Sequence, residues 1–529
     1  MKASRVAWAL LAAAAAAASL CESAGLAKFA FGGSDGSRLS ISVRRAVGRF
    51  VPRGERVTFY RGDSAERPSQ ICRSLFLSMA WAAGAGNVGE KRSLDGDERY
   101  VVVSPLSFVP ASLRENPRYR EFRGPETGAI WIREDAPVAL LEREDCGAPA
   151  EIRGAGIAAV ARECWDWREA VSLAAPAALS LALLAFALRR IPSRGELLLC
   201  AAVCVPVAMF ALSHSFTGPC GTGVFGGRAK ALVESGWNIA SLADSGMGEY
   251  FQAAYPPMQA LVAAVGYAMS GVCGEWLVQL GPVMFLGAAF LAMASGCSGG
   301  FPARLLLAAA CVTHPMAMAA GNFCAEPLML LLVASGWRAV VRGDARGWFL
   351  VGLAAFVKNE GIFYAAAVAA AEAAARPSGR TAAEVREAAA ALALGLLPAA
   401  LWHFGCRWIG ASLYDYAQPW RPDFARGLAA LKAVALEAAL HPWRYMFVPA
   451  AAAAWVSARV CGANGGDGAR SARAAAVFFA VCAGGACCAF SLSRAPDFAW
   501  HLSCMPRLLA PAAALALARA LAPMSRQTE

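Results

Sequence analysis

The sequence predicts an all-α polytopic membrane bundle of about 10–13 transmembrane helices, with a small α/β or β-rich extracytoplasmic domain near the N-terminus. Hydrophobic residues fill 58% of the 529 positions, and the mean hydropathy of +0.45 is well above that of soluble domains. Apolar runs long enough to cross a bilayer follow one another after residue 169, whereas residues 22–168 are polar. The predicted divisions are therefore residues 1–21, 22–168 and 169–529.

Charge and cysteine content argue against two other classes. The 49 Lys and Arg residues exceed the 38 Asp and Glu residues, for a net charge of +11. Much of this excess lies in short loops between apolar runs, which is typical of cytoplasmic loops, so no nucleic acid partner is expected. The 17 cysteines show no CxxC or metal-ligand spacing, so no metal site is assigned, although a divalent cation stays open as a cofactor. Six of them are expected to be packing residues in apolar runs: Cys200, Cys204, Cys311, Cys482, Cys487 and Cys488.

The chain begins with a basic and then apolar segment. Lys2 and Arg5 precede the apolar run 6–20, which suits either a signal peptide or a short first transmembrane anchor. Either one would export the polar residues that follow.

Residues 22–168 are the one region expected to fold in water. Residues 100–103, 129–132 and 138–141 have the composition of short strands bounded by Pro, Gly and charged residues. Cys72, Cys146 and Cys164 also lie here, and an oxidising compartment would permit a disulfide whose pairing stays open. The domain contains no histidine, which argues against a catalytic role for it.

Basic clusters set the topology of the membrane part. The apolar run 171–188 ends in Arg189 and Arg190, which predicts a cytoplasmic end, and run 196–212 then crosses back. This places the loop of residues 213–257 outside, on the same side as the soluble domain. Four apolar runs follow before the next basic cluster, although the topology requires an odd number of crossings. They begin near Met258, Trp276, Pro302 and Cys324, and one of them must be partial or interfacial.

The apolar stretch 348–375 carries Lys358, Asn359, Glu360 and Gly361 near its middle. The two arms of about 10 and 14 residues would measure roughly 15 and 21 Å, and neither crosses ~30 Å of hydrocarbon alone. A helical pair that enters and returns would hold Lys358 and Glu360 at membrane depth, facing outside. The alternative is one long helix whose charges snorkel or pair inside the bundle.

Charged residues gather at the predicted outer face. Loop 213–257 is far longer than an ordinary connection, and such loops usually carry function. Segments 406–441 and 493–497 are expected to form two further outer loops, and Arg507 lies about two helical turns below the outer end of the last span. Lys358 and Arg507 are therefore expected to converge beneath these loops, an arrangement suited to an anionic substrate.

Four short stretches follow one another at matching topological positions: RAKAL at 228–232, YPP at 255–257, VKNEG at 357–361 and RAPDFAWHLSCMPRLLAP at 494–511. Together they resemble motifs of the C-type (GT-C) polytopic membrane glycosyltransferases, in the bacterial branch related to protein O-mannosyltransferase and aminoarabinose transferase. The resemblance covers about residues 196–515 and leaves residues 22–168 outside.

The resemblance implies that a sugar moves from a polyprenyl-phosphate donor to a hydroxyl of an acceptor glycan, lipid or protein. The reaction would take place at the extracytoplasmic face of a bacterial inner (plasma) membrane, among membrane lipids. The donor phosphate would be held by Lys358, Arg507, Arg228 and Lys230. Glu249 is the first choice for the base that takes the acceptor proton and Asp244 the second. Glu360, His501 and Tyr255 are further site candidates.

The chain departs from the family at two acids. The positions where the family carries them hold Cys220 and Ala254. Either Asp244 or Glu249 has taken over, or the chain is a catalytically degenerate GT-C-fold protein or a glycolipid-binding or transport protein. Both loop acids are equally well read as ordinary solvated carboxylates. The absence of an internal repeat argues against a transporter.

Overall fold

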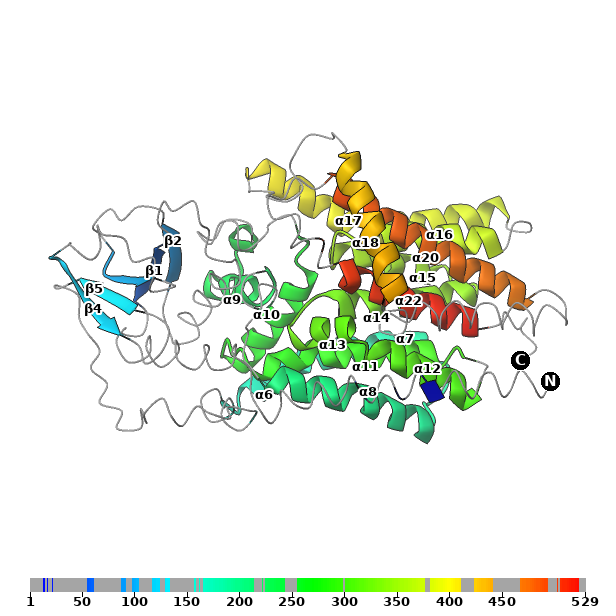
Figure 1. Cartoon of the computed structure of the whole chain (residues 1–529), viewed down its shortest axis with the longest axis horizontal. Coiled ribbons are helices and arrows are strands. Elements are labelled where there is room, and N and C mark those ends of the chain that lie inside the picture. Colours follow the sequence, from blue (N-terminus) through cyan, green and yellow to red (C-terminus); the bar gives the residue numbers. More distant parts are fainter. Residues whose placement is uncertain are drawn as a thin grey trace.

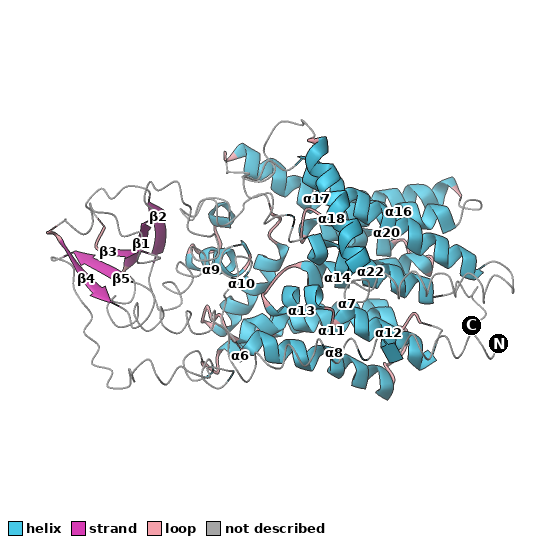
Figure 2. Ribbon diagram, in the orientation of Figure 1, coloured by secondary structure: helices cyan, strands magenta, loops and turns pink. Residues whose placement is uncertain are grey.

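The structure of the chain is a computed structural model, and helices make up most of what it describes (Figures 1 and 2). Besides a few isolated positions, it describes residues 55–60, 87–91, 98–103, 117–123, 129–133, 165–213, 224–242, 255–297, 300–375, 381–410, 423–440, 467–492 and 505–522.

The N-terminal part contains a mixed sheet of five strands in the order β2-β1-β3-β5-β4. Its strands are β1 Arg56–Tyr60, β2 Asn87–Lys91, β3 Tyr100–Val103, β4 Tyr119–Arg123 and β5 Ala129–Arg133. β1 pairs in parallel with β2 and β3, whereas β5 is antiparallel to β3 and β4. β3 and β5 confirm the strands predicted at 100–103 and 129–132; the one predicted at 138–141 lies outside the described residues.

Five segments in the described part of the chain are long and apolar enough to cross a membrane, so the chain is a helical membrane protein. They are Glu169–Ala187 (α6 Glu169–Ser172 and α7 Ala174–Ala187), α8 Arg194–Leu212, Leu277–Ala294 (η6 Leu277–Gln279 and α11 Leu280–Ala294), α17 Ala382–Trp408, and Gly468–Leu492 within α20 Asp467–Leu492. A sixth is formed if α12 Gly300–Cys311 and α13 His314–Gly321, bent by 58°, count as one span. The predicted total of about 10–13 stays a prediction, because this count covers only the described residues.

The helices of the bundle share two ends. We call the end where α8 finishes at Leu212 the loop end, and the end with Arg190 the arginine end. Trp276 Nε1 donates to Leu212 O at 2.9 Å, so α11 starts at the loop end. Arg342, at the end of α14 Glu326–Val341, donates to Ala187 O, so α14 finishes beside the end of α7, at the arginine end. α11 finishes there too, because Arg338 Nη2 donates to Ser295 O at 2.9 Å.

This geometry identifies the partial helix among the four apolar runs. Arg304 of α12 pairs with Glu196 at the arginine end, and Gly321 of α13 lies against the ring of Phe210 at the loop end. α11, the α12–α13 pair and α14 therefore each run from one end of the bundle to the other. The remaining run forms α10 Met258–Ser270, which packs on α6 at the loop end through Gly266 and Ser172. Its 13 residues extend only about 20 Å, too short to cross.

The stretch around Lys358 enters the bundle and returns. It forms α15 Arg346–Leu353, η7 Ala354–Phe356 and, after the break, α16 Gly361–Ala375. Gly347 lies against Gly336 near the end of α14, and the Lys358 side chain reaches Glu326 at the start of α14, so α15 runs antiparallel to α14. Trp337 Nε1 donates to Glu372 Oε1 at 2.9 Å, so α16 runs parallel to α14. The alternative of one long helix is wrong, because the chain reverses at the break.

The outer loop predicted at 406–441 is wrong for residues 424–440, which form the helix α18 Phe424–Leu440. Asp423 N donates to Ser491 O at 2.8 Å, and Ala430 shares an apolar cluster with Ala486 and Phe490 of α20 and with Met505 of α22 Met505–Leu521. α18 therefore lies along α20 as part of the bundle. The charged residues of α18 lower its average hydropathy. A helix with a single apolar face therefore resembled a loop in the sequence.

Close packing of α15 on α17 leads to a first prediction. A Cβ added at Gly352 of α15 would lie 2.6 Å from Leu392 O of α17. By contrast, no atom lies within 4 Å of a Cβ added at Gly405, which is also in α17. Gly352→Ala should therefore lower the thermal stability of the detergent-solubilised protein by about 1–3 kcal/mol, since overpacking forces backbones apart. Gly405→Ala should be neutral or stabilising by about 0.5–1 kcal/mol, through helix propensity. Equal melting temperatures for the two variants would contradict this packing.

Candidate functional site

Four charged side chains meet at the loop end of α14, and we call them the Lys358 cluster: Glu326, Lys358, Glu360 and Arg507. Lys358 Nζ lies 3.1 Å from Glu326 Oε1 and 3.4 Å from Glu360 Oε1. Arg507 Nε of α22 lies 3.8 Å from the same Glu326 oxygen. Glu326, Lys358 and Glu360 are all buried. The predicted convergence of Lys358 and Arg507 is therefore present, with Glu326 between them.

Glu326 was missed in the sequence, where it stood near the start of an apolar run beginning at Cys324. An acid in the first turn of a helix is favourable in any protein, because it complements the helix dipole. Its signal was its position: a carboxylate beside an apolar run is expected to have a partner. That partner is 32 residues away in the sequence, at Lys358.

Tight backbone geometry holds the cluster in place. Phe323, between α13 and α14, is buried with φ at 58°, a left-handed conformation that bulky residues rarely adopt. It directly precedes Cys324, whose Sγ lies 3.3 Å from Arg507 Nη1. At the break, Gly361 packs on the backbone of Ala354, where no Cβ would fit. Strain of this kind persists where the surroundings hold it, and it is common at functional sites.

Arg228 approaches the cluster from α9 Gly226–Glu234, and it is 0% exposed. Its Nη1 donates to Tyr255 O at 2.8 Å, and its guanidinium lies 5.1 Å from the ring centroid of Trp402. Lys358 Nζ lies 5.9 Å from the Tyr255 ring, so Tyr255 stands between Arg228 and the Lys358 cluster.

No carboxylate among the described residues pairs with Arg228, and its Nε and Nη2 have no hydrogen-bond partner there. Burial lowers the pKa of Arg228 to about 9, which still leaves a cation at neutral pH. An isolated buried charge is costly to a fold unless a ligand or partner uses it.

Lys230 lies two residues further along α9 and has a different environment. Its Nζ lies 3.7 Å from Glu234 Oε1, one turn away. Both Arg228 and Lys230 are buried, so neither is a surface charge. Within the described residues, only Arg228 of the two has no carboxylate partner.

Several predicted site residues lie outside the described residues. These are Asp244, Glu249 and His501, together with Cys220 and Ala254 at the two departures from the family pattern. Their roles stay predictions. In the described ranges, no group of three or more His, Cys, Asp or Glu side chains could hold a metal ion.

Comparison of this chain with protein-family models, with curated proteins and with solved structures found no match. The fold and the site define a class: a helical membrane protein with a buried cluster of paired charges at the loop end of its bundle, and with a buried arginine, Arg228, beside that cluster.

Proposed function

We propose that this chain is a membrane glycosyltransferase that moves a sugar from a polyprenyl-phosphate donor to an acceptor hydroxyl. The observation that carries the proposal is Arg228, a buried cation joined through Tyr255 to the Lys358 cluster and without a carboxylate partner among the described residues. In this proposal the protein lies in a bacterial inner membrane with its loop end on the extracytoplasmic side.

The charge balance of the site suits a lipid-linked phosphodiester. Arg228, Lys358 and Arg507 supply three positive charges, and Glu326 and Glu360 supply two negative charges, which leaves one positive charge. A polyprenyl-phosphate sugar is a phosphodiester with one negative charge. When the sugar leaves, the phosphate becomes a monoester with additional negative charge, which nearby cations stabilise.

The reaction consists of one displacement at the anomeric carbon. The acceptor oxygen forms a bond to that carbon on one face, while the bond from the carbon to the phosphate oxygen breaks on the other, which inverts the configuration. The acceptor proton passes to a carboxylate, for which Glu249 is the first candidate and Asp244 the second.

A transfer assay tests this function. The purified protein in lipid nanodiscs is given undecaprenyl phosphate carrying a radiolabelled hexose, together with a cell-envelope extract as acceptor. Label should leave the prenyl-lipid fraction with the intact protein. Glu249→Gln should abolish transfer and leave binding of undecaprenyl phosphate unchanged, because only the proton acceptor is lost. Full turnover in both Glu249→Gln and Asp244→Asn would show that neither carboxylate takes the acceptor proton.

A second function, binding of a glycolipid without catalysis, is favoured by one observation. Both carboxylates of the Lys358 cluster, Glu326 and Glu360, form ion pairs with Lys358. The described part of the site therefore holds cations that could bind an anion, together with two carboxylates that are already ion-paired. Binding of undecaprenyl phosphate with no transfer of label to any acceptor fraction would identify this alternative.

A further inference from the structure

The arginine end carries a second concentration of charge, separate from the proposed site. We call five arginines the arginine-end cluster: Arg189, Arg190, Arg304, Arg338 and Arg342. They come from the connection between α7 and α8, from α12 and from the end of α14. Arg189 and Arg190 lie close enough to Arg338 for their charges to repel it, and Arg189 does the same to Arg342.

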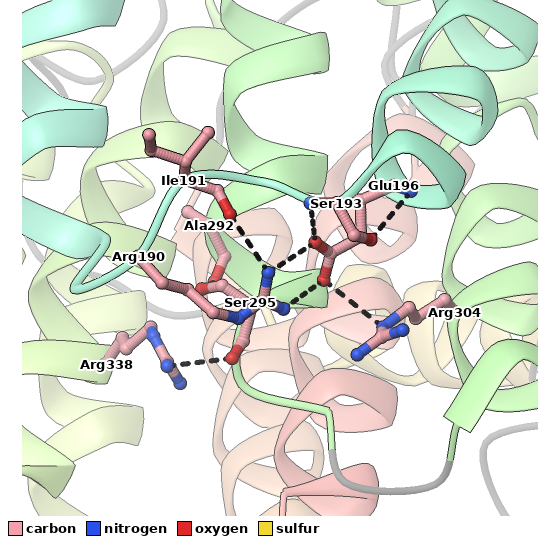
Figure 3. Close-up of polar contacts among 8 residues, drawn as sticks. All are labelled: Arg190, Ile191, Ser193, Glu196, Ala292, Ser295, Arg304 and Arg338. Atoms are coloured by element: carbon pink, nitrogen blue, oxygen red, sulfur yellow. Dashed lines mark hydrogen bonds and ion pairs between the residues drawn. The ribbon is translucent and has the colours of Figure 1, made fainter.

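In the described part of the chain, Glu196 is the one carboxylate that pairs with arginines of this cluster, and both of its oxygens accept hydrogen bonds. Arg190 contacts both oxygens of Glu196, at 2.8 Å from Nη1 and 2.5 Å from Nη2. Arg304 Nε lies 3.2 Å from Glu196 Oε1, and Ser193 N donates to Oε2 at 2.7 Å. Figure 3 shows Arg190 and Arg304 reaching Glu196 from two sides, with Arg338 apart from it on Ser295.

The other three arginines have no carboxylate partner among the described residues. The nearby Asp344 pairs with Arg346 at 2.8 Å. The five arginines of the cluster and Glu196 therefore carry a net charge of four positive charges.

Backbone carbonyls hold two of these guanidinium groups in place. Arg338 Nη2 donates to Ser295 O, just past the end of α11, and Arg342 Nη2 donates to Phe186 O at 3.1 Å, near the end of α7. Helix C-termini carry partial negative charge, which orients a cation without neutralising it. Arg338 Nε is buried and has no hydrogen-bond partner among the described residues. The positive-inside rule accounts for the presence of basic residues at a cytoplasmic end. It does not account for guanidinium groups that are held by backbone carbonyls.

Exposed apolar side chains border the cluster. Leu197 and Leu198 directly follow Glu196 and are 49% and 72% exposed. Phe301, 56% exposed, lies three residues before Arg304 on α12, which places both on one face of that helix. A free phosphate would make no contact with these apolar side chains, whereas the acyl chains of a phospholipid would cover them.

We propose that the arginine-end cluster binds the headgroup phosphate of an anionic phospholipid, whose acyl chains lie against Leu197, Leu198 and Phe301. Basic sites between membrane helices recognise such headgroups by charge. This site does not depend on the proposed glycosyl transfer, because it lies at the opposite end of the bundle and shares no residue with the Lys358 cluster.

Native mass spectrometry of the detergent-solubilised full chain tests the proposal. Short-chain phosphatidylglycerol should bind at least ten times more tightly than phosphatidylcholine of the same chain length. Arg338→Gln should remove most of that preference. Arg346→Gln is the matched control, since Arg346 lies nearby but pairs with Asp344, and it should leave binding unchanged. Arg189→Gln, which alters an exposed side chain and so preserves folding, should weaken binding several-fold.

Three results would overturn the proposal. The first is equal binding of the two lipids, and the second is equal behaviour of Arg189→Gln and Arg346→Gln. The third is displacement of phosphatidylglycerol by millimolar inorganic phosphate, which would show a site for the free anion. Arg228→Gln should leave phosphatidylglycerol binding intact, and this separates the site from the one at the loop end.

Discussion

Glu326→Gln should lower the thermal stability of the protein more than any other single change at the loop end. Lys358 and Arg507 both contact Glu326 Oε1, so the neutral side chain leaves two cations with Glu360 as the remaining acid of the cluster. Removing one partner of a buried ion pair typically costs about 3–5 kcal/mol, because the other charge stays buried without compensation. Thermal unfolding of the detergent-solubilised protein, followed by intrinsic tryptophan fluorescence, measures the effect.

Two comparisons make this result specific. Asp344→Asn removes the partner of the exposed Arg346 and should cost no more than about 1 kcal/mol, as is usual for surface ion pairs. Adding Lys358→Met to Glu326→Gln restores the charge balance, with Arg507 and Glu360 left. The double variant should therefore be more stable than Glu326→Gln alone, a non-additivity expected of groups in one network. A Glu326→Gln protein that melts like Asp344→Asn would show that the cluster does not hold the bundle together.

Arg228→Met should change stability and ligand binding in opposite directions. Replacing a buried charge that lacks a counter-charge with an apolar side chain of similar length should stabilise the unliganded protein by about 1–4 kcal/mol. Affinity for undecaprenyl phosphate should fall roughly 10- to 100-fold, since a hydrogen bond to a charged group contributes about 1.5–3 kcal/mol. Thermal unfolding and a lipid-binding titration on the same preparation measure the two effects.

Lys230→Met is the matched control for this pair of measurements. Lys230 lies on the same helix but pairs with Glu234, so its replacement removes an ion pair and should not stabilise the protein. If Arg228→Met instead destabilised the protein and left lipid binding unchanged, Arg228 would be a structural residue. The proposal of a phosphate site would then lose the observation that carries it.

Local patterns were enough to predict much of the architecture. Apolar runs separated by arginine clusters give the positions of spans, because hydrocarbon accepts only long apolar helices and basic residues stay on one side. The reversal at Lys358 was one of two alternatives for the stretch 348–375, and the short length of its two arms was the argument for it. Since that reversal and the start of the last span were placed at the same face, the convergence of Lys358 and Arg507 could be predicted as well.

Contacts between distant segments could not be read in this way. Glu326 looked like an ordinary first-turn acid until Lys358, 32 residues later, was seen to pair with it. The burial of Arg228 depends on Trp402 of α17 and on the Tyr255 carbonyl. α18 required α20 beside it to be recognised as part of the bundle. Hydropathy reflects how a segment interacts with its solvent, whereas pairing and burial depend on which side chains the folded chain brings together; the first is local in the sequence and the second is not.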